Sequence, residues 1–475
     1  MMSETDVIVV GSGVAGLSAA IEAAAAGGRV VVLEAQDWIG GASVMSGAAC
    51  CLVGTPLQEA NGITDSVELA LADWAATGGP TADLAWARRY VENSRRDVYE
   101  WCEQLGIRWV ALTQPEGNSV PRWHLPGGWG REIVRRLLAR ARSLGVTVRT
   151  GTPVTQVLTE GSAIRGVAIG GDEGGLRCRS VIICSGGFAG NRDMVLEQAP
   201  RLRSLPRLLS GGSPHAVGAG HRLLAAAGAA FTCLDHIWVY PNGTPDPCDP
   251  RGERGLGIRG LAGEIWLNAD GRRFHDEGLN GGRSGTAALL AQPGQTCWCV
   301  FGETQLESLL LIDNEYFGTP AGPHPEAMAR FWAESRYAWR AEGPEQLAAA
   351  AGLPPDAVRA SVDEFNAAIR AGLDRDLQTG RDLRGLAPLE GPLAAIQYFP
   401  MAQKNFGGVR TDLDCRVLDE SGEVISGLFA AGEVAGMAGG CINGRSALEG
   451  TMFGPCLYSG RVAGIAAAAV VGALR

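Results

Sequence analysis

The hydrophobic and polar positions of the first 35 residues predict a strand, a helix and a second strand. In residues 6–10, DVIVV, an apolar β-branched run follows the aspartate, as expected for a parallel strand buried on both faces. Residues 11–26 open with spaced glycines and continue as an alanine-rich segment, which favours a helix. Residues 29–35, RVVVLEA, form another apolar run that reaches an acid near its end. The pattern therefore predicts a β-α-β unit.

The glycines of this unit predict a nucleotide site. Gly11, Gly13 and Gly16 permit a tight turn, close approach of the backbone to a pyrophosphate, and close packing of helix on strand. The helix N-terminus offers unpaired N–H groups to the anion. Glu34 stands 18 residues past Gly16, where an acid can bind the ribose hydroxyls. Taken alone the glycines fit an ordinary turn, but the full order favours a dinucleotide, and the acid favours FAD or NAD over NADP.

Later segments repeat the pattern of apolar runs that end in glycines or acids. Two of them are a strand ending in a glycine pair at 178–187 and a short strand ending in Gly-Glu at 426–433, and two further strands around a turn are predicted at 145–169. A glycine-rich run occupies 38–48. Helices are predicted at 444–469, as one long run, and at 344–372, as two amphipathic helices broken at Pro354–Pro355. We interpret the helices at 344–372 as scaffold.

Composition narrows the class of protein. A chain of 475 residues with 46% hydrophobic and 19% charged residues predicts a globular protein of two or three domains. Its net charge of −10 argues against nucleic acid and against an anionic membrane as partners. The start of the chain lacks the pattern of a signal peptide, and the apolar run VAGIAAAAVVGAL near its end is too short to span a bilayer. We therefore expect a cytoplasmic protein that binds no membrane.

The twelve cysteines are scattered and include no CxxC pair. This spacing excludes zinc ribbons, c-type haem attachment and ferredoxin-like clusters. We expect most of the thiols to be small buried side chains in a reducing compartment, and we expect no metal site.

Seven segments give the chain a resemblance to a known family. In chain order they are the β-α-β unit, WIGGAS, WHLPGG, VIICSGGFAGN, GEIWLNADGRRFHDEG, NFGGVRTD and GLFAAGEVAGM. They resemble those of the flavoprotein family that contains fumarate reductase, succinate dehydrogenase and the ketosteroid dehydrogenases. The resemblance implies an α/β fold with a discontinuous, Rossmann-like FAD-binding domain and a smaller inserted α+β capping domain that binds substrate. It places the FAD domain at 1–235 and 389–475 and the inserted domain at 236–388.

The same resemblance assigns residues to FAD. It puts Glu433 on the ribityl chain and points the N-terminus of the last helix, near Ala447 to Gly450, at the flavin N1/O2 edge, where negative charge develops. Members that attach FAD covalently do so through a histidine just after the GG pair, whereas this chain has Ala42 and Ser43, so we expect non-covalent FAD. The candidate FAD-binding residues are Gly11, Gly13, Val14, Ala15, Gly16, Glu34, Ala35, Gly41, Ala42, Ser43, Val154, Ser185, Gly186, Gly187, Asn191, Gly432, Glu433, Ala447 and Leu448.

Three residues are candidates for the proton transfers. Arg283 is the first arginine after the RFxxE motif at 273–277, although it lies further from the motif than in the fumarate-reducing relatives. It is open whether Arg283 delivers a proton, clamps a substrate oxygen or is a solvated loop residue. Tyr240 stands where dicarboxylate-reducing relatives carry a histidine, and its phenol can donate to a carbonyl or remove an α-proton. Tyr398 is the third candidate; each tyrosine also fits a core position.

Three further residues are candidate substrate contacts. The resemblance places Lys404 at another substrate histidine, Arg445 near a carboxylate-binding arginine and His124 beside the active site. Lys404 and Arg445 also fit surface charges, and His124 also fits a local hydrogen-bonding role. Because two dicarboxylate-binding positions are changed, the four carboxylate oxygens of fumarate would have too few partners. Trp238, Trp266 and the two tyrosines suit a flatter guest, such as a cyclic ketone or a monocarboxylate.

Together these residues predict an FAD-dependent dehydrogenase that desaturates a C–C bond next to a carbonyl of a cyclic ketone or oxo-carboxylate. We find no second nucleotide fingerprint, haem motif or cluster motif, so electrons must pass to a diffusible acceptor or to a separate redox protein. The alternatives are an α,β-unsaturated carboxylate reductase of the fumarate reductase type and a flavoprotein subunit that needs an electron-transfer partner.

Overall fold

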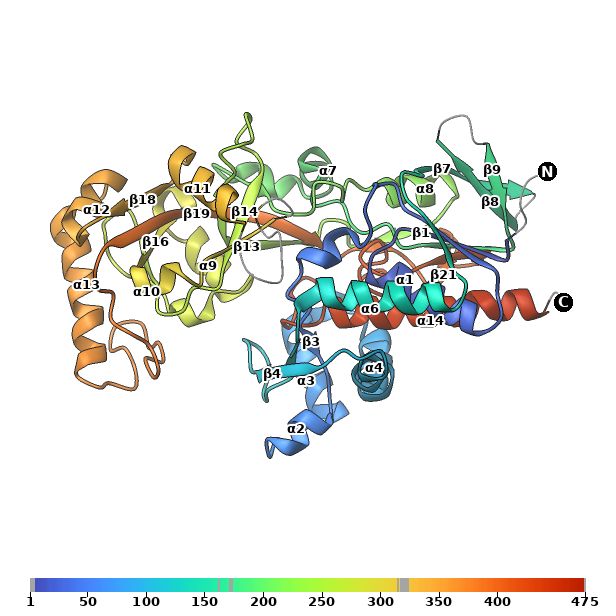
Figure 1. The fold of residues 1–475 in the computed structure, drawn as a ribbon, viewed down its shortest axis with the longest axis horizontal. Helices are drawn as coiled ribbons and strands as arrows, with labels where there is room; N and C mark the ends of the chain where they lie inside the picture. The colour runs from blue at the N-terminus through green and yellow to red at the C-terminus, as the bar shows by residue number, and fades with distance from the viewer. Residues whose placement is uncertain (1–4, 161–162, 171–173, 314–315, 317–323, 474–475) are drawn as a thin grey trace. The chain divides into compact units, whose positions relative to one another are not determined.

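The fold was analysed in a computed structural model that describes residues 5–160, 163–170, 174–313, 316 and 324–473 (Figure 1). The chain divides into two compact units. The first contains Met1–Ala199, Gly212–Trp238 and Lys404–Arg475, and the second contains Pro200–Gly211 and Val239–Gln403.

A six-stranded sheet forms the centre of the first unit. Its order is β21-β22-β10-β1-β2-β6, with β21 antiparallel to its neighbour and the other strands parallel. The strands are β21 (Arg416–Leu418), β22 (Val424–Ala430), β10 (Ser180–Ile183), β1 (Val7–Val10), β2 (Val30–Leu33) and β6 (Thr147–Arg149). The four residues of β1 are all buried, as the continuous apolar run predicted. The predicted strand–helix–strand at the start of the chain is confirmed, with helix α1 at Val14–Ala25.

Helix α1 packs against the last helix, α14 (Phe453–Ala473), as Figure 1 shows. The approach depends on Gly460 and Gly464, where an added Cβ would lie 2.2 Å from the Ala15 carbonyl oxygen and 2.3 Å from that of Ala19. Helix α14 is longer than the apolar run near the chain end, and its window 453–470 is long and apolar enough to cross a membrane. The argument from length was therefore wrong. However, 67% of that window is buried inside the protein, as in the core helix of a folded domain.

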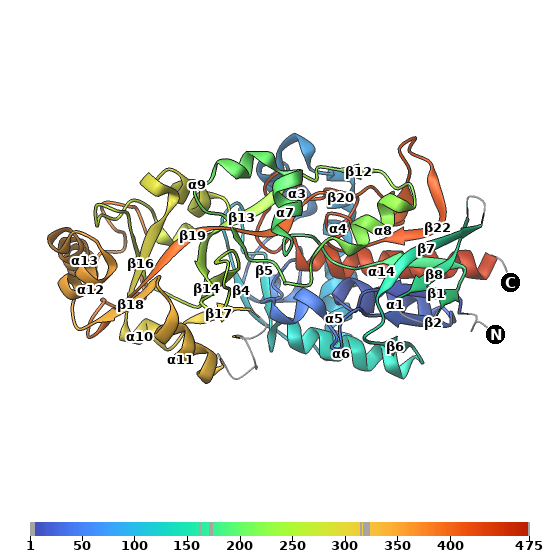
Figure 2. The same cartoon turned by 90° about the horizontal axis from the view of Figure 1, so that it is seen from above.

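Smaller elements complete the first unit (Figure 2). One antiparallel sheet contains β7, β8 and β9, another contains β3, β5 and β4, and β12 pairs with β20. The strands are β7 (Val154–Glu160), β8 (Ala163–Ile169), β9 (Gly175–Arg177), β3 (Cys50–Cys51), β5 (Trp123–Pro126), β4 (Trp109–Thr113), β12 (Phe231–Thr232) and β20 (Gly408–Val409). The helices include α2 (Pro56–Ala60), α3 (Val67–Gly78), α4 (Leu84–Ser94), α5 (Trp101–Gln104), α6 (Trp129–Ser143), α7 (Arg192–Gln198) and α8 (Ala219–Ala226). The turn predicted between β7 and β8 falls at 161–162, outside the described residues.

The second unit is built on an eight-stranded sheet. Six strands follow the order β15-β16-β19-β13-β14-β17, and β11 and β18 also pair with β19. The strands are β11 (Leu209–Ser210), β13 (Ile237–Pro245), β14 (Gly255–Arg259), β15 (Ile265–Leu267), β16 (Cys297–Gly302), β17 (Leu310–Ile312), β18 (Ala338–Ala341) and β19 (Leu393–Asn405). The helices are α9 (Ser284–Leu290), α10 (Glu303–Leu306), α11 (Pro325–Glu334), α12 (Pro344–Ala351) and α13 (Pro355–Arg370). The last two confirm the predicted helices and their break.

The second unit extends further along the sequence than the segment 236–388 predicted for the inserted domain. Strand β19 runs on to Gln403 within this unit, because it lies at the middle of the sheet with β16 on one side and β13 on the other. Residues 200–211 also belong here, because β11 pairs with β19. A central strand is buried and apolar like a strand of the first unit, so composition alone could not place the boundary.

Candidate active site

The glycine loop after β1 is held by contacts that only glycine permits. Gly11 has φ of 103°, and an added Cβ there would lie 2.4 Å from the carbonyl oxygen of Cys184. An added Cβ on Gly16 would lie 2.0 Å from the carbonyl oxygen of Gly11. Gly13 precedes α1 and supplies no side-chain cap. The loop therefore combines close backbone approach with a helix N-terminus that no side chain of its N-cap residue covers.

Glu34 is oriented by the same loop. Its Oε2 accepts hydrogen bonds from the backbone N–H of Ser12 at 2.9 Å and from the Ser12 hydroxyl at 2.6 Å. Its Oε1 accepts from the backbone N–H of Gln36 at 3.0 Å. The side chain is buried at the end of β2, at the carboxyl edge of the parallel sheet. This is the position at which open α/β sheets bind ligands.

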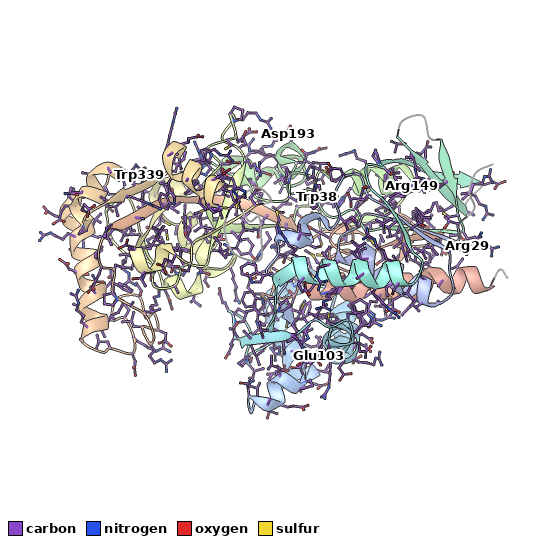
Figure 3. All side chains as sticks on the ribbon, viewed as in Figure 1. Arg29, Trp38, Glu103, Arg149, Asp193 and Trp339 are labelled. Carbon is purple, nitrogen blue, oxygen red and sulfur yellow. The ribbon has the colours of Figure 1, made fainter. Side chains whose placement is uncertain are left out.

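The glycine-rich run at 38–48 packs against this loop. The Ser43 hydroxyl accepts from the Val14 N–H at 3.2 Å, and the Gly40 N–H donates to the Ser12 hydroxyl at 3.0 Å. Trp38, labelled in Figure 3, packs edge-on against His215 with ring centroids 5.9 Å apart. The structure thus brings together Ser43 and the predicted residues of the glycine loop. Ser12, which joins both segments to Glu34, was missed because its glycine-rich setting gave it no separate signal.

A second set of predicted FAD residues gathers around Glu433. An added Cβ on Gly187 would lie 2.4 Å from Oε1 of Glu433 and 2.1 Å from Oδ1 of Asn405. Burial raises the pKa of Glu433 to about 7, against the opposing charge of Lys404. Asn405 donates its backbone N–H to Glu433 at 3.2 Å and accepts the Phe188 N–H at 2.9 Å. Asn405 therefore links the segment of Gly187 to that of Glu433. The signal for Asn405 in the sequence was its place at the start of the motif NFGGVRTD.

The N-terminus predicted for the last helix is wrong. Helix α14 begins at Phe453, whereas Ala447 and Leu448 lie in the non-helical segment before it. Thr451 donates its hydroxyl to the Leu448 carbonyl, and the Asn443 amide donates to the Thr451 carbonyl at 2.9 Å. These bonds fold the segment before the helix into turns. The sequence did not indicate the turns, because the residues of this segment are also compatible with a helix.

The first unit fits a dinucleotide cofactor. The tight glycine contacts occur where the backbone must approach closely. At Gly41 and Gly186, by contrast, none of the described residues has an atom within 4 Å of an added Cβ. The structure therefore leaves open space beside two of the predicted residues and a backbone cradle at Gly11 to Gly16. The other predicted FAD residues, Ala35, Ala42, Val154, Ser185, Asn191 and Gly432, lie in the first unit as well. Their contacts with FAD stay a prediction.

The side chain of His124 is buried and hydrogen-bonded within the protein. It is fully buried on β5, with Nε2 2.7 Å from the Thr55 hydroxyl and Nδ1 2.7 Å from the Arg122 carbonyl oxygen. Burial lowers its pKa to about 4, so the ring is neutral. Arg122 is itself fully buried and pairs with Asp65 at 2.8 Å and with Asp73 at 2.5 Å. Because both ring nitrogens already have protein partners, the predicted substrate contact gains no support.

Lys404 and Arg445 lie in the first unit in different surroundings. The charge of Lys404 acts on the buried Glu433 carboxyl, which associates this lysine with the predicted FAD residues. Arg445 is half exposed and donates to Oδ2 of Asp235 at 3.1 Å. The substrate-binding roles of both residues stay predictions.

In the second unit, the RFxxE motif forms part of a buried ion-pair network. Arg273 donates to both oxygens of Glu277, at 2.9 and 2.8 Å, and also pairs with Asp376. Glu277 is fully buried and also pairs with Arg381 at 3.1 Å. The carboxylate that ends the motif is therefore committed to structural partners.

Arg283 and Tyr240 come from adjoining elements. Arg283 is exposed and is the residue that precedes helix α9. One turn later the Thr286 hydroxyl donates to the carbonyl of Val239, the residue before Tyr240, at 2.7 Å. The Tyr240 ring is buried on β13, and the guanidinium of Arg259 on β14 lies 4.8 Å from its centroid. Arg259 was missed, because nothing in GLGIRG indicates which ring its side chain meets.

Tyr398 lies in the core of the second unit. It is 3% exposed on β19 and meets Trp266 edge to face, with centroids 5.6 Å apart. Burial raises its pKa well above the ordinary value for tyrosine, and its hydroxyl pairs with Cys299. Its surroundings are those of a packing residue, and its catalytic role stays a prediction without support from these contacts.

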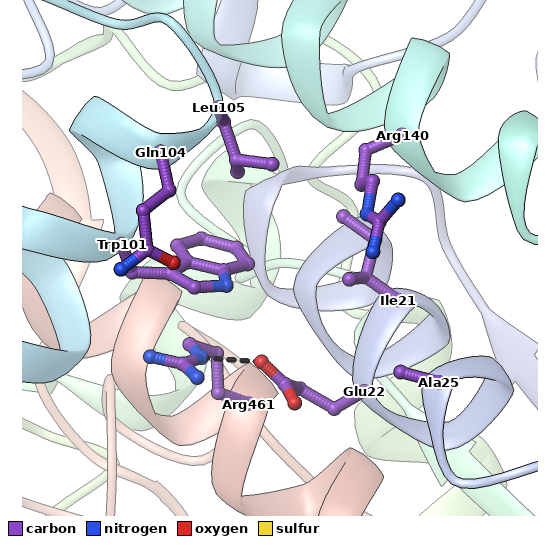
Figure 4. Close-up of a pocket in the computed structure, with 8 residues that line it drawn as sticks. All are labelled: Ile21, Glu22, Ala25, Trp101, Gln104, Leu105, Arg140 and Arg461. Carbon is purple, nitrogen blue, oxygen red and sulfur yellow. Dashed lines mark hydrogen bonds and ion pairs between the residues drawn. The ribbon is translucent and has the colours of Figure 1, made fainter.

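A surface cavity of about 310 Å³ lies elsewhere in the first unit (Figure 4). It is lined by the second half of α1, by α5 and by parts of α6 and α14. The ion pair between Arg461 Nε and Glu22 Oε1, at 2.6 Å, lies at its wall. None of its lining residues is a predicted FAD or substrate residue, so this cavity is separate from the glycine cradle.

Comparisons with known proteins agree with this geometry. A family model described as "FAD binding domain" matches residues 6–451. A KsdD-like steroid dehydrogenase of Mycobacterium tuberculosis is 32% identical, over 98% of this chain and 95% of its own length.

Two solved structures share the fold. One is an open flavocytochrome c3 fumarate reductase, with a TM-score of 0.74, 27% identity, and coverage of 99% of this chain and 79% of the other. The second is the 3-ketosteroid-Δ4-(5α)-dehydrogenase of Rhodococcus jostii RHA1 with 4-androstene-3,17-dione, with a TM-score of 0.69, 28% identity, and coverage of 98% and 97%. The chain therefore belongs to the FAD-binding flavoprotein family of the fumarate reductase and ketosteroid dehydrogenase type, and it is an FAD-dependent oxidoreductase.

Proposed function

We propose that this enzyme is a dehydrogenase that desaturates a C–C bond next to a carbonyl, in a cyclic ketone or an oxo-carboxylate. The observation that carries the proposal is the buried phenol of Tyr240 on β13, which has the Arg259 guanidinium 4.8 Å from its ring centroid. A phenol beside a fixed positive charge suits removal of an α-proton from a ketone. The similarity to steroid dehydrogenases at 32% and 28% identity supports the same substrate class.

Each unit takes one part of this function. We assign FAD to a Rossmann-like domain in the first unit, supported by its parallel sheet, the glycine loop and Glu34. We assign a capping role to the second unit, which contributes Tyr240 and Arg283.

The reaction needs two hydrogens to leave neighbouring carbons. FAD, when bound, supplies the chemistry of hydride acceptance at its N5. The Tyr240 oxygen takes the α-proton, and the Arg259 charge stabilises the phenolate that this proton transfer requires. Arg283 holds the substrate carbonyl oxygen and favours the enolate-like charge that develops there. Glu34 and Glu433 hold hydroxyl groups of the cofactor.

FAD binds without a covalent bond in this proposal, because Ala42 and Ser43 occupy the positions after the glycine pair. Acid precipitation of purified protein should leave a colourless pellet and a yellow supernatant. A yellow pellet that survives washing would contradict non-covalent binding. We further propose a cytoplasmic enzyme whose electrons pass to a diffusible acceptor or to a separate redox protein.

Matched tyrosine variants test the reaction. Tyr240→Phe removes the proposed base, and Tyr398→Phe removes a hydroxyl in the core of the same unit. With ring ketones and an artificial dye, we expect Tyr240→Phe to lose at least ~100-fold in turnover, since proton transfer contributes about that much. Tyr398→Phe should retain most of the activity, and both should retain FAD. Equal activity of the two variants would refute the role of Tyr240.

An α,β-unsaturated carboxylate reductase is the second candidate. The observation that favours it is Arg283 at the start of α9, next to the strand of Tyr240, together with the likeness to a fumarate reductase at 27% identity. In that case Arg283→Lys should reduce turnover of unsaturated acids by at least ~100-fold with reduced dye, while Tyr240→Phe stays active. If the purified chain binds FAD but turns over substrate only with a partner protein, it is an electron-transferring subunit.

A further inference from the structure

Two cysteines and a histidine meet in the first unit, and none of the three is assigned above to FAD or to substrate. Cys233, His236 and Cys441 each offer one ligand atom, and the three atoms lie within 4.8 Å of one another. The Sγ of Cys441 lies 3.5 Å from Nδ1 of His236. His236 and Cys441 are buried, and Cys233 is half-buried.

Local backbone structure brings these side chains together. Cys233 follows β12 directly, and the His236 N–H donates to the Cys233 carbonyl at 2.8 Å, which closes a turn with Cys-x-x-His spacing. Cys233 has φ of 53°, a conformation that non-glycine residues rarely adopt. Figure 2 labels β12 and its partner β20, the strand pair from which this turn begins.

Two glycines allow the remaining approach. An added Cβ on Gly407 would lie 1.9 Å from the Cys233 carbonyl oxygen, and one on Gly440 would lie 2.8 Å from Cγ2 of Thr232. Gly440 has φ of 101° and immediately precedes Cys441. The turn and the Cys441 loop are therefore held close by contacts that leave no room for larger residues.

One separation within the cluster can be compared with that expected for a tetrahedral metal site. Zinc–sulfur and zinc–nitrogen bonds of about 2.3 and 2.1 Å at a tetrahedral angle place sulfur and nitrogen about 3.6 Å apart. The separation of 3.5 Å between Cys441 Sγ and His236 Nδ1 matches this value. We propose that Cys233, His236 and Cys441 bind one zinc ion through two thiolates and Nδ1, with a fourth position left for water.

The surrounding groups suit this ligand set. Oδ1 of Asp235 lies 3.7 Å from Nε2 of His236, on the side of the ring away from Nδ1. A carboxylate there favours the tautomer that leaves Nδ1 free to bind metal. Asp235 is in turn held by Arg445 at 3.1 Å, and the Thr232 hydroxyl donates to Cys233 Sγ at 3.4 Å.

Zinc is the cation that this chemistry favours. Thiolates and imidazole select soft or borderline ions over Mg²⁺ and Ca²⁺, which prefer oxygen ligands. Two thiolates and a neutral imidazole also neutralise a divalent ion, so its burial leaves no net charge. Because both thiols must release protons, binding should strengthen as pH rises. The site does not depend on which substrate the enzyme takes.

The test uses the FAD-loaded enzyme, first stripped of metal with a chelator. Competition with a chromogenic zinc chelator should give about one tight site per chain, and X-ray absorption should show two sulfur ligands. Asp235→Asn should weaken binding by about 10- to 100-fold as an outer partner, and Cys441→Ser by more than that. Cys248→Ser removes an exposed thiol of the second unit and should change nothing. Equal zinc affinity of Cys441→Ser and Cys248→Ser would overturn the proposal.

A second measurement needs no variant. Zinc should protect the half-buried thiol of Cys233 in the wild-type enzyme from alkylation by iodoacetamide, as read by peptide mass spectrometry. The exposed Cys248 should react with or without zinc. If zinc leaves the alkylation rate of Cys233 unchanged, this thiol does not bind zinc and the site is wrong.

Discussion

Replacing Gly16 with alanine should cost the enzyme its FAD. The added Cβ would lie 2.0 Å from the carbonyl oxygen of Gly11 and 3.3 Å from Cγ1 of Val9. A non-bonded contact needs about 3.5 Å, so helix and loop must separate by about 1.5 Å. The atom that the Cβ meets belongs to the backbone, so no rotamer change can relieve the contact.

The magnitude follows from two opposing effects. Overpacking costs about 1–3 kcal/mol, and the upper end applies where backbone meets backbone. Alanine in a helix returns about 1 kcal/mol relative to glycine. Without cofactor the loop can relax outward, but bound FAD requires its N–H groups in place, so the remaining cost of about 2 kcal/mol falls on binding. At about 1.4 kcal/mol for each tenfold change, FAD should bind ~30-fold more weakly.

Gly472→Ala is the matched control. It makes the same change inside helix α14, and no atom of the residues that the structure describes lies within 4 Å of the added Cβ. The dissociation constant of FAD is measured by flavin fluorescence quenching with apoprotein of both variants. We expect Gly472→Ala to bind like the wild type. Unchanged FAD affinity of Gly16→Ala would show that the loop does not hold the cofactor through this contact, and the reasoning would fail.

Two other predictions concern buried charges. Arg122→Met leaves Asp65 and Asp73 without their fully buried cation. Urea unfolding of the holoenzyme should therefore show that the free energy of unfolding falls by about 3–5 kcal/mol. A fall of less than about 1 kcal/mol would contradict this view. Burial lowers the pKa of His221 to about 4 from 6.5, so the unfolded chain takes up its proton first as pH falls. The folded state therefore loses roughly 3 kcal/mol between pH 6.5 and 4 through this group. His221→Phe should flatten the dependence of the unfolding free energy on pH over that interval, and the same slope in both proteins would refute it.

Local patterns were enough to predict much of the fold. The strand–helix–strand at the start of the chain follows from apolar runs and glycines that act within a few residues of each other. The break between α12 and α13 follows from a proline pair. The start of α14 was missed because the turns before it depend on Asn443 and Thr451, whose side chains compete with a helix that the sequence otherwise allows.

Long-range pairing explains what could not be predicted. The boundary of the second unit depends on the position of β19 within its sheet, which composition does not encode. His124 lies in a motif that the resemblance places beside the active site. Its hydrogen-bond partners are instead the Thr55 hydroxyl and the Arg122 carbonyl, 69 and 2 residues away in the sequence. As an aromatic residue Tyr398 was expected to contact a flat substrate. Its position on β19 instead directs its ring toward Trp266 in the core of the second unit.

The cysteines show the same limit most directly. A search for CxxC pairs tests for two ligands on one turn, and this chain contains none. Its turn carries Cys-x-x-His instead, and the second thiol arrives from 205 residues away. The pairing of β12 with β20 and the close approach at Gly407 and Gly440 bring that thiol into place. When tertiary structure assembles the ligands, only two of the three lie close together in the sequence. The absence of a metal motif from a sequence therefore does not establish the absence of a metal site.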